Sequence, residues 1–426
     1  MATPRGKGSG KGKSELGKGA APAADADNPT ADKILLGDHA QKLFVKAGTV
    51  GVIALALSLL LGFTGDTRQF MHSYLVAFMW TLSIALGALW WVTLQHLVNA
   101  KWSVVVRRVG ELLAQNMTLL VFLSLPIVLP TILGDSSLYF WADKGKMDAD
   151  HILHQKAAYL NAPFFAVRFI IYFGFWAGLA NYFLVRSVRH DQQGKQELLA
   201  GMARTSAPSM ILIAITLTFA AIDFLMSLDP MWFSTIFGVY YFAGCVLAVH
   251  ATFALALMWI QSKGRLLKSV HTEHYHDIGK MMFAFVIFWA YIAFSQFMLI
   301  WYANVPEETA WYKERFEGAW GTVAWVLLFC HFVIPFFGLL SRHVKRNRKG
   351  LAFWSVWMLV VHYIDMYWLV KPNLGGHQLS ISVLDFTCWL ALGSLLVAAT
   401  AYQARKVSLL PVKDPRLAQS LAFENI

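Results

Sequence analysis

Ten predominantly apolar stretches run through this chain, and each is long enough to cross a lipid bilayer as a helix. A spanning helix needs roughly 20 such residues, and it bonds every backbone polar group within its own segment. Only 14% of the 426 residues are charged, against about 25% in an average soluble domain. The sequence therefore predicts an all-α integral membrane protein with ten transmembrane helices. The predicted spans are 46–63, 71–97, 110–133, 162–186, 209–228, 232–261, 278–302, 318–341, 350–370 and 380–402.

The basic residues are distributed unevenly between the two sides of the membrane. Ten spans place both termini on one side. That side carries 27 of the 36 Lys and Arg residues, the opposite side carries 7, and Arg168 and Lys280 lie within spans. Since basic loops stay in the cytoplasm, we expect both termini to be cytoplasmic. The same rule accounts for the net charge of +11 without nucleic acid as a partner.

The chain is predicted to hold one membrane domain, residues 32–402, between two tails. Residues 1–31 are rich in Gly, Lys and Ala and have no apolar core. They are expected to form a disordered basic cytoplasmic tail that contacts a partner or anionic lipids, and not a signal peptide. Residues 403–426 form the second cytoplasmic tail. Pro126 and Pro130 are expected to kink the third span and Pro335 the eighth.

Polar side chains recur at a similar depth on five predicted spans, roughly 8–9 Å below the outer face at 1.5 Å per residue. His362 and Tyr291 lie about one turn deeper than this level. A charge in the bilayer is costly, whereas carboxylates and histidines on neighbouring helices can pass protons along a relay. The candidates for a proton path are Arg168, Asp223, His331, His362, Asp365, Asp385, Tyr291, Ser295 and Gln296.

These residues also have structural interpretations. Arg168 with Asp223 is equally well read as an ion pair that joins two helices, and a buried histidine is often a hydrogen-bonded core residue. Polar residues near helix ends can reach water at the interface. On that ground we expect Gln95, Glu111, Asp277 and Lys280 to be interfacial.

The sequence predicts no metal and no redox centre bound by this chain. Its three cysteines, Cys245, Cys330 and Cys388, lie far apart in apolar runs without iron–sulfur or haem-attachment spacing. The run "HTEHYHD" at residues 271–277 is interpreted as helix-end polar residues at the lipid headgroups. Ligation of haem b by His250 and His331 is an alternative that the spacing leaves open.

Three segments carry a resemblance to a known family: "AAIDFLMSLDPMWFSTIFGVYYFAG", "HDIGKMMFAFVIFWAYIAFSQFMLIWYANVPEET" and "HFVIPFFGLLSR". With residues 46–402 around them, they resemble the NrfD-like membrane subunits of bacterial respiratory complexes. The similarity is greatest to the F subunit of alternative complex III, a quinol:electron-acceptor oxidoreductase.

The resemblance implies two four-helix bundles, spans 2–5 and 6–9, flanked by spans 1 and 10, in the bacterial inner membrane. It implies partner subunits: a paralogous NrfD-like subunit better suited to quinol oxidation, an iron–sulfur subunit and haem c subunits. It leaves a terminal oxidase open as a further partner, beside lipids. The F-type role is usually proposed to be proton conduction, and a quinone or menaquinone pocket is left open.

Three functions are compatible with these observations. The first is a membrane subunit of a quinol-oxidising complex that contributes a transmembrane proton path and is not catalytic alone. The second is a purely structural anchoring subunit of the same complex. The third is an independent secondary transporter, which would favour paired helix interruptions in the two halves.

Overall fold

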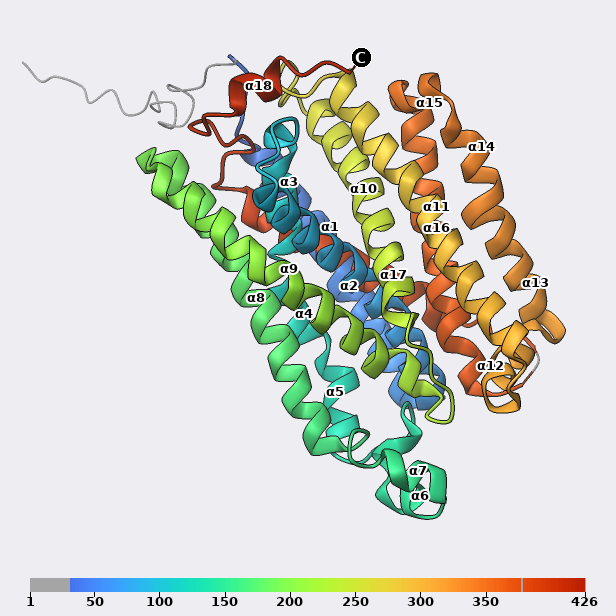
Figure 1. The fold of residues 1–426 in the computed structure, drawn as a ribbon. Coiled ribbons are helices and arrows are strands. Elements are labelled where there is room, and N and C mark those ends of the chain that lie inside the picture. The colour runs from blue at the N-terminus through green and yellow to red at the C-terminus, as the bar shows by residue number, and fades with distance from the viewer. Residues whose placement is uncertain (1–30, 377, 426) are drawn as a thin grey trace, which may run out of the picture.

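The computed structural model describes residues 31–376 and 378–425, and within this part every regular element is a helix (Figure 1). Ten of the helical segments are long and apolar enough to cross a membrane. The predicted fold class, an all-α protein with ten transmembrane helices, is confirmed. The predicted tail over residues 1–31 lies, but for Ala31, outside the described residues.

Eight spans begin with or consist of one long helix. They are α1 (Asp38–Thr64), α2 (Thr67–Leu97), α8 (Ala162–Gln193), α9 (Gln196–Phe224), α10 (Phe237–Ser262), α11 (Thr272–Ala303), α16 (Arg348–Val370) and α17 (Val383–Ala404). The 3₁₀ turns η2 (Met226–Leu228) and η4 (Lys371–Leu374) extend α9 and α16. Several of these helices extend beyond the predicted apolar stretch on the side of the molecule where the chain ends. There the helix continues into polar solvent, and its residues are no longer apolar enough to identify it from the sequence.

The other two spans are interrupted, as their prolines predict. The third consists of α3 (Val104–Ala114), α4 (Met117–Leu123) and α5 (Leu125–Ile132), and Pro126 and Pro130 both lie in α5. The eighth consists of α13 (Gly318–Leu327), the π-helix η3 (Leu328–Val333) and α14 (Ile334–Leu340). Pro335 stands in the first turn of α14, where its missing N–H disrupts the regular ladder.

Two helix groups pack side by side around α2, which is buried along almost its whole length. The first bundle contains α2, the third span, α8 and α9, and the second contains α10, α11, the eighth span and α16. α2 also packs against α10, α16 and α17, and α1 covers α17. The seam between the bundles is close, because a Cβ at Gly87 of α2 would lie 2.2 Å from the carbonyl oxygen of Cys245 in α10.

Short helices close both ends of the molecule (Figure 1). The chain ends on the side where α18 (Leu417–Leu421) and α15 (Arg342–Arg346) lie, and we call this the terminal side. The opposite side carries η1 (Phe140–Ala142), α6 (Lys144–Asp148), α7 (His151–Lys156) and α12 (Pro306–Phe316). The two long connections on the opposite side therefore carry short helices of their own.

Candidate functional site

Three polar residues of the second bundle meet in its interior. His362 and Asp365 lie one turn apart on α16, and His331 approaches them from the π-helix η3. All three side chains are fully buried, and each offers one nitrogen or carboxylate oxygen within 4.8 Å of the others. We call this group the second-bundle triad. The sequence placed its members at different depths of neighbouring spans, and the structure brings them together.

Asp365 is held by donors from two other helices. The hydroxyl of Tyr240 in α10 donates to its Oδ1, and the indole N–H of Trp289 in α11 donates to its Oδ2 at 3.2 Å. The carboxyl therefore joins α16 to α10 and α11. No basic side chain among the described residues lies within ion-pair distance, apart from His362, whose Nδ1 is 3.9 Å from Oδ2.

The hydrogen bonds around Ser83 fix the tautomer of His362. The Ser83 hydroxyl donates its single proton to the carbonyl of Trp80 at 2.7 Å. It must then accept from Nε2 of His362, which lies 2.9 Å away. In the neutral ring Nδ1 is left with a lone pair that faces Asp365. Gly244 of α10 makes room for this ring, because a Cβ there would lie 2.6 Å from its Cε1.

His331 is the least satisfied member of the triad. Neither ring nitrogen has a hydrogen-bond partner among the described residues, although the side chain is fully buried. The ring centroid lies 3.8 Å from that of Trp289 and 6.4 Å from that of His362. An unpaired buried imidazole costs about 1–3 kcal/mol, and π-helical turns of the kind that carries it are frequent at functional sites.

The first bundle holds an ion pair that, unlike the triad, is fully hydrogen-bonded. Arg168 of α8 binds Asp223 of α9 through two parallel bonds, from Nε at 2.8 Å and from Nη2 at 2.9 Å. Tyr172 donates to the same carboxylate at 2.9 Å. The guanidinium also donates to the carbonyl of Tyr159 and stacks on the ring of that residue. This group is saturated, so the structural interpretation of the pair describes it best.

The remaining predicted path residues do not join either group. Gln296 is buried and bonds Ser234 and Tyr312 near the opposite side. Ser295 is half-buried. Tyr291 does not face the triad: its side chain is 63% exposed on the outer face of α11.

The depth of Asp385 in its span also differs from the predicted depth. The predicted span began at residue 380, whereas α17 begins at Val383, which puts Asp385 in the first turn of the helix. There its carboxylate accepts from the backbone N–H of Ser382 as part of a capping box. It also lies 2.6 Å from Nζ of Lys371. Its role is to cap and anchor a helix end.

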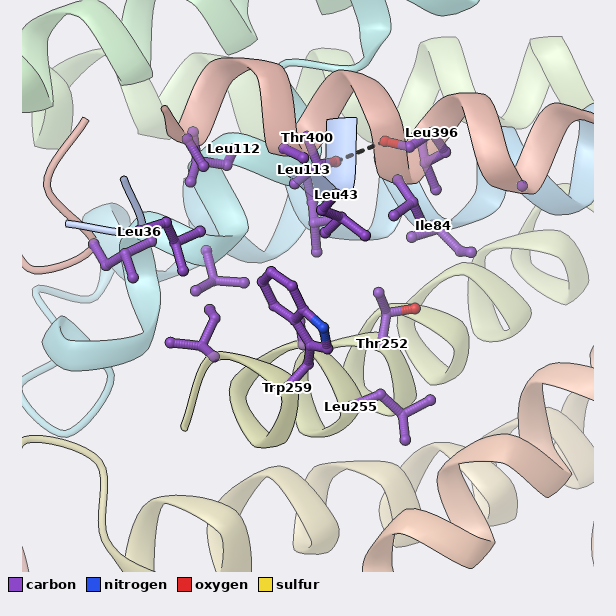
Figure 2. A pocket seen from close by; sticks show the side chains of 18 of the residues that line it. Leu36, Leu43, Ile84, Leu112, Leu113, Thr252, Leu255, Trp259, Leu396 and Thr400 are labelled. Atoms are coloured by element: carbon purple, nitrogen blue, oxygen red, sulfur yellow. Dashed lines mark hydrogen bonds between the residues drawn. The ribbon is translucent and has the colours of Figure 1, made fainter. Parts of the chain in front are cut away.

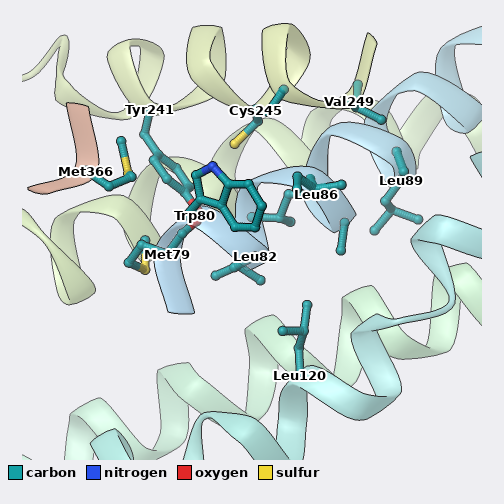
Figure 3. Close-up of a cluster of buried hydrophobic side chains, with 14 of the residues drawn as sticks. Met79, Trp80, Leu82, Leu86, Leu89, Leu120, Tyr241, Cys245, Val249 and Met366 are labelled. Atoms are coloured by element: carbon teal, nitrogen blue, oxygen red, sulfur yellow. The ribbon is translucent and has the colours of Figure 1, made fainter. Parts of the chain in front are cut away.

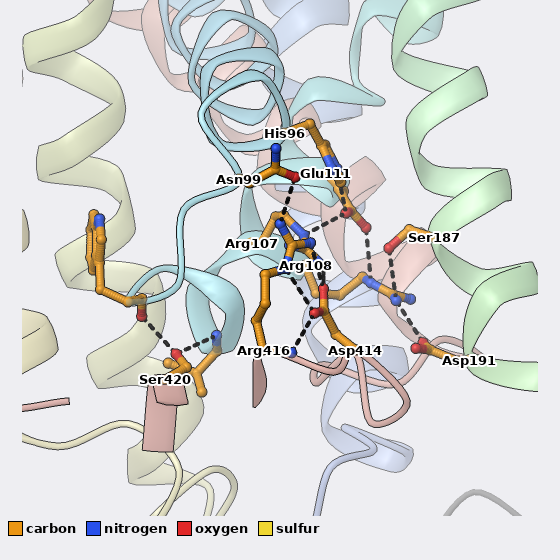
Figure 4. A network of polar contacts seen from close by, with 12 residues as sticks. His96, Asn99, Arg107, Arg108, Glu111, Ser187, Asp191, Asp414, Arg416 and Ser420 are labelled. Atoms are coloured by element: carbon orange, nitrogen blue, oxygen red, sulfur yellow. Dashed lines mark hydrogen bonds and ion pairs between the residues drawn. The ribbon is translucent and has the colours of Figure 1, made fainter. Parts of the chain in front are cut away.

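A second buried polar cluster lies on the terminal side (Figure 4). Glu111 of α3 is within 3.0 Å of Nε of Arg108 and within 3.8 Å of Nε2 of His96. Arg107 extends the cluster to Asp414 of the C-terminal segment at 2.5 Å. Glu111 is therefore an internal ion-pair residue and not an interfacial one. We call this group the terminal-side cluster; it comprises His96, Arg107, Arg108, Glu111, Asp191, Asp414 and Arg416.

Asp414 attaches the C-terminal segment to α3. Burial by itself would raise the pKa of Asp414, but the guanidinium groups of Arg107 and Arg416 outweigh it and hold that pKa well below its usual range. Leu409, Leu410 and Leu417 of the same segment are buried. The C-terminal segment is thus packed against the membrane domain.

About 20 Å of helix separate Ser83 from His96 along α2. In this interval α2 packs through apolar side chains, and Figure 3 shows Leu86 and Leu89 on the side of α2 that faces Val249 of α10. The triad and the terminal-side cluster are therefore divided by an apolar layer.

The other histidines that the sequence singled out have local partners. His271 caps the N-terminus of α11, and His274 bonds the backbone of His271 and of Ser420. Nδ1 of His250 bonds the carbonyl of Val246, and its ring packs near Phe285. The ring of His250 thus packs in a different place from the triad.

An apolar cavity of about 330 Å³ opens between the two bundles on the terminal-side half (Figure 2). Trp259 of α10 points into it, and leucines of α1, α3 and α17 surround it. Its two hydroxyls, Thr252 and Thr400, donate to carbonyls of their own helices. The lining suits a hydrocarbon chain better than a polar ring.

Sequence reasoning missed the residues that complete these groups. Tyr240, Trp289 and Ser83 lie in apolar runs with nothing to distinguish them from core residues, and Lys371 looks like a loop lysine. The terminal-side cluster left one usable signal, because Arg107, Arg108 and Glu111 fall within one helical turn at the start of an apolar stretch.

The comparisons with known proteins add no family. No protein-family model matches the chain, and no curated protein sequence matches it. What stands plainly is a multi-pass integral membrane protein with ten candidate spans in the described residues.

Proposed function

We propose that this chain is the proton-conducting membrane subunit of a bacterial quinol:electron-acceptor oxidoreductase of the alternative complex III type. In this role it lies in the cytoplasmic membrane with its terminal side toward the cytoplasm. Iron–sulfur and haem c subunits would carry the electrons, and the chain itself would hold a proton path. The three segments that resemble NrfD-like subunits support the complex, and the second-bundle triad supports the role.

The observation that carries the proposal is the relation of His362 to Asp365. Nδ1 of His362 lies 3.9 Å from a carboxyl oxygen, and within the described part of the chain no lysine or arginine neutralises that carboxyl. When the carboxyl takes up a proton, a shift of about 1 Å makes this contact a hydrogen bond along which the proton can pass to Nδ1. His331, with both nitrogens unpartnered, stands next to the pair as the further proton carrier.

The route toward the opposite side begins at Asp365 and its donor Tyr240. Beyond them Gln296 links Tyr312 of α12 to Ser234, at 3.1 and 3.2 Å, close to the surface. The route toward the terminal side passes from His362 to Ser83. It then meets mainly apolar side chains, in the layer of Figure 3 and in the lining of the cavity of Figure 2, so proton transfer across the whole chain requires water to enter this region.

The test is Asp365→Asn in the intact complex, with protons released per electron as the measurement. The amide keeps the shape of the side chain and its acceptor oxygen but does not exchange a proton. We expect quinol oxidation by the partner subunits to continue while proton release attributable to this subunit is lost. Wild-type proton stoichiometry in an assembled Asp365→Asn complex would overturn the proposal.

The matched control is Asp148→Asn, which changes an exposed carboxylate on the opposite side. It should leave both assembly and proton release unchanged. If Asp365→Asn lowers only the yield of assembled complex, the anchoring function is favoured instead. If the chain moves a solute without the partner subunits, the transporter function is favoured.

The apolar cavity of Figure 2 favours an isoprenoid or acyl chain, and both of its hydroxyls are already engaged. The proposal therefore assigns quinol oxidation to the paralogous subunit. A photo-reactive quinone should label that subunit. Labelling of residues around Trp259 would instead assign a quinone-binding site to this chain.

A further inference from the structure

We propose that the second-bundle triad is a binding site for a divalent transition metal, with Zn²⁺ as the best match. Two imidazoles and one carboxylate with a fourth position open to water make up a common zinc ligand set. His331, His362 and Asp365 supply these groups from η3 and α16. The site is not one that sequence spacing predicts, because its ligands lie on two separate spans.

Each of the three groups has a ligand atom within reach of the other two. The bond to Ser83 occupies Nε2 of His362 as a donor, which leaves the Nδ1 lone pair free on the side of Asp365. Such an outer bond is the usual means of fixing the tautomer of a metal-ligating histidine. Asp365 is likewise held by Tyr240 and Trp289, which leaves lone pairs on its oxygens. His331 has both nitrogens unpartnered and fully buried.

The distances require only a small contraction. Ligand atoms around a tetrahedral zinc ion lie about 3.4 Å apart, given zinc–ligand bonds of about 2.0–2.2 Å. The triad atoms lie within 4.8 Å of one another, and Nδ1 of His362 lies 3.9 Å from an oxygen of Asp365. The π-helix that carries His331 directly precedes a proline and departs from the regular α-helical ladder, as helices at functional sites often do.

The charges at the site are compatible with a cation. With neutral imidazoles and an ionised Asp365 the triad carries a single negative charge, and a divalent ion would change it to a single positive one. The carboxylate is not neutralised by a lysine or arginine, in contrast to Asp223 of the first bundle. Because zinc needs the lone pairs that protons would take, binding competes with protonation and weakens as the pH falls.

The experiment uses the full chain purified in mild detergent and stripped with a chelator. Zn²⁺ alone is added, excess ion is removed by gel filtration, and bound zinc is counted per chain; Co²⁺ supplies a visible spectrum that reports coordination. We expect one equivalent with a tetrahedral cobalt spectrum in wild type. Its loss is expected in His331→Ala, and His250→Ala, an equally buried histidine outside the triad, should retain it.

A second variant protects the test against misfolding. Ser83→Ala removes no ligand but frees the tautomer of His362, and we expect a 10–100-fold weaker affinity. Less than one equivalent in wild type, or equal binding by wild type, His331→Ala and Ser83→Ala, overturns the proposal.

The proposed zinc site does not depend on the proposed function. The effect of bound zinc on proton release does rest on it, because that effect requires the chain to conduct protons. Bound Zn²⁺ would hold the three groups that exchange protons, so it should stop proton release in the intact complex. If wild type binds one equivalent of zinc and proton release is undisturbed, the zinc site is supported and the proton path is refuted. If Asp365→Asn loses proton release but wild type binds no zinc, the proton path is supported and the zinc site is refuted.

Discussion

The two bundles bury aspartates in different ways. In the first bundle, Asp223 receives two bonds from Arg168 and one from Tyr172, all between 2.8 and 2.9 Å. In the second, Asp365 receives neutral donors from Tyr240 and Trp289 and faces a histidine lone pair. The first carboxylate is bound to a guanidinium that neutralises it, whereas the second has only neutral donors and histidines around it among the described residues. Burial alone does not identify a functional carboxylate; its partners do.

The largest effect expected from this comparison is on the first bundle. Asp223→Ala leaves the guanidinium of Arg168 buried without its counter-ion, which should cost about 3–5 kcal/mol of unfolding free energy. Unfolding in mixed detergent micelles measures it. Asp148→Ala, which removes an exposed ion pair, should cost less than about 1 kcal/mol. Equal stability of the two variants would mean that the Arg168 pair is not the anchor we describe.

A smaller loss is expected at the terminal-side cluster. Asp414→Ala removes charge-assisted bonds to Arg107 and Arg416 and should cost about 1.5–3 kcal/mol. The C-terminal segment should then become sensitive to carboxypeptidase. Lys413→Ala changes the exposed neighbour and should leave the segment protected.

The same contact has a defined pH dependence. The folded pKa of Asp414 is depressed, so its stabilisation is fully present above the unfolded value, about 3.9. It is lost only as the pH falls through the lower folded value. Protection of the wild-type segment should therefore be constant between about pH 5 and 8, and a decrease within that window would contradict the ion pair.

A methyl group added beside the triad should cause an intermediate loss of stability. Gly244→Ala places a methyl group 2.6 Å from the ring of His362, which forces the ring or α10 to move at a cost of about 1–3 kcal/mol. Proton release should fall with it, because the ring is displaced from Asp365. Gly174→Ala in α8, where a methyl meets nothing within 4 Å, is the control and should be neutral or slightly stabilising. Normal proton release in Gly244→Ala would show that the position of His362 is not critical.

The smallest loss of stability separates the bundles most sharply. His331→Leu replaces an imidazole that makes no hydrogen bond among the described residues, so the unfolding free energy should equal that of wild type or exceed it by up to about 3 kcal/mol. Proton release should nevertheless be impaired. A loss as large as that of Asp223→Ala would mean that His331 is a structural residue like Arg168.

The composition of the chain predicts its fold class and spans well, because a bilayer imposes length and hydropathy on every crossing helix. All ten spans lie close to the predicted stretches, and the breaks at Pro126 and Pro335 follow from the chemistry of proline. The depth of His362 and Asp365 also follows from their position in a helix.

The side chains that contact these polar residues cannot be predicted from composition, because they depend on which helices are neighbours and how each helix is rotated. Tyr291 and Trp289 are two residues apart on α11, yet one faces outward and the other binds Asp365. Asp385 looked like a membrane carboxylate until the start of α17 placed it in a helix cap with Lys371. The sequence by itself determined that polar groups are buried in this membrane protein. Only the tertiary structure decided that Asp223 meets an arginine and Asp365 a tyrosine and a tryptophan, since a hydrogen bond is made across helices at about 3 Å.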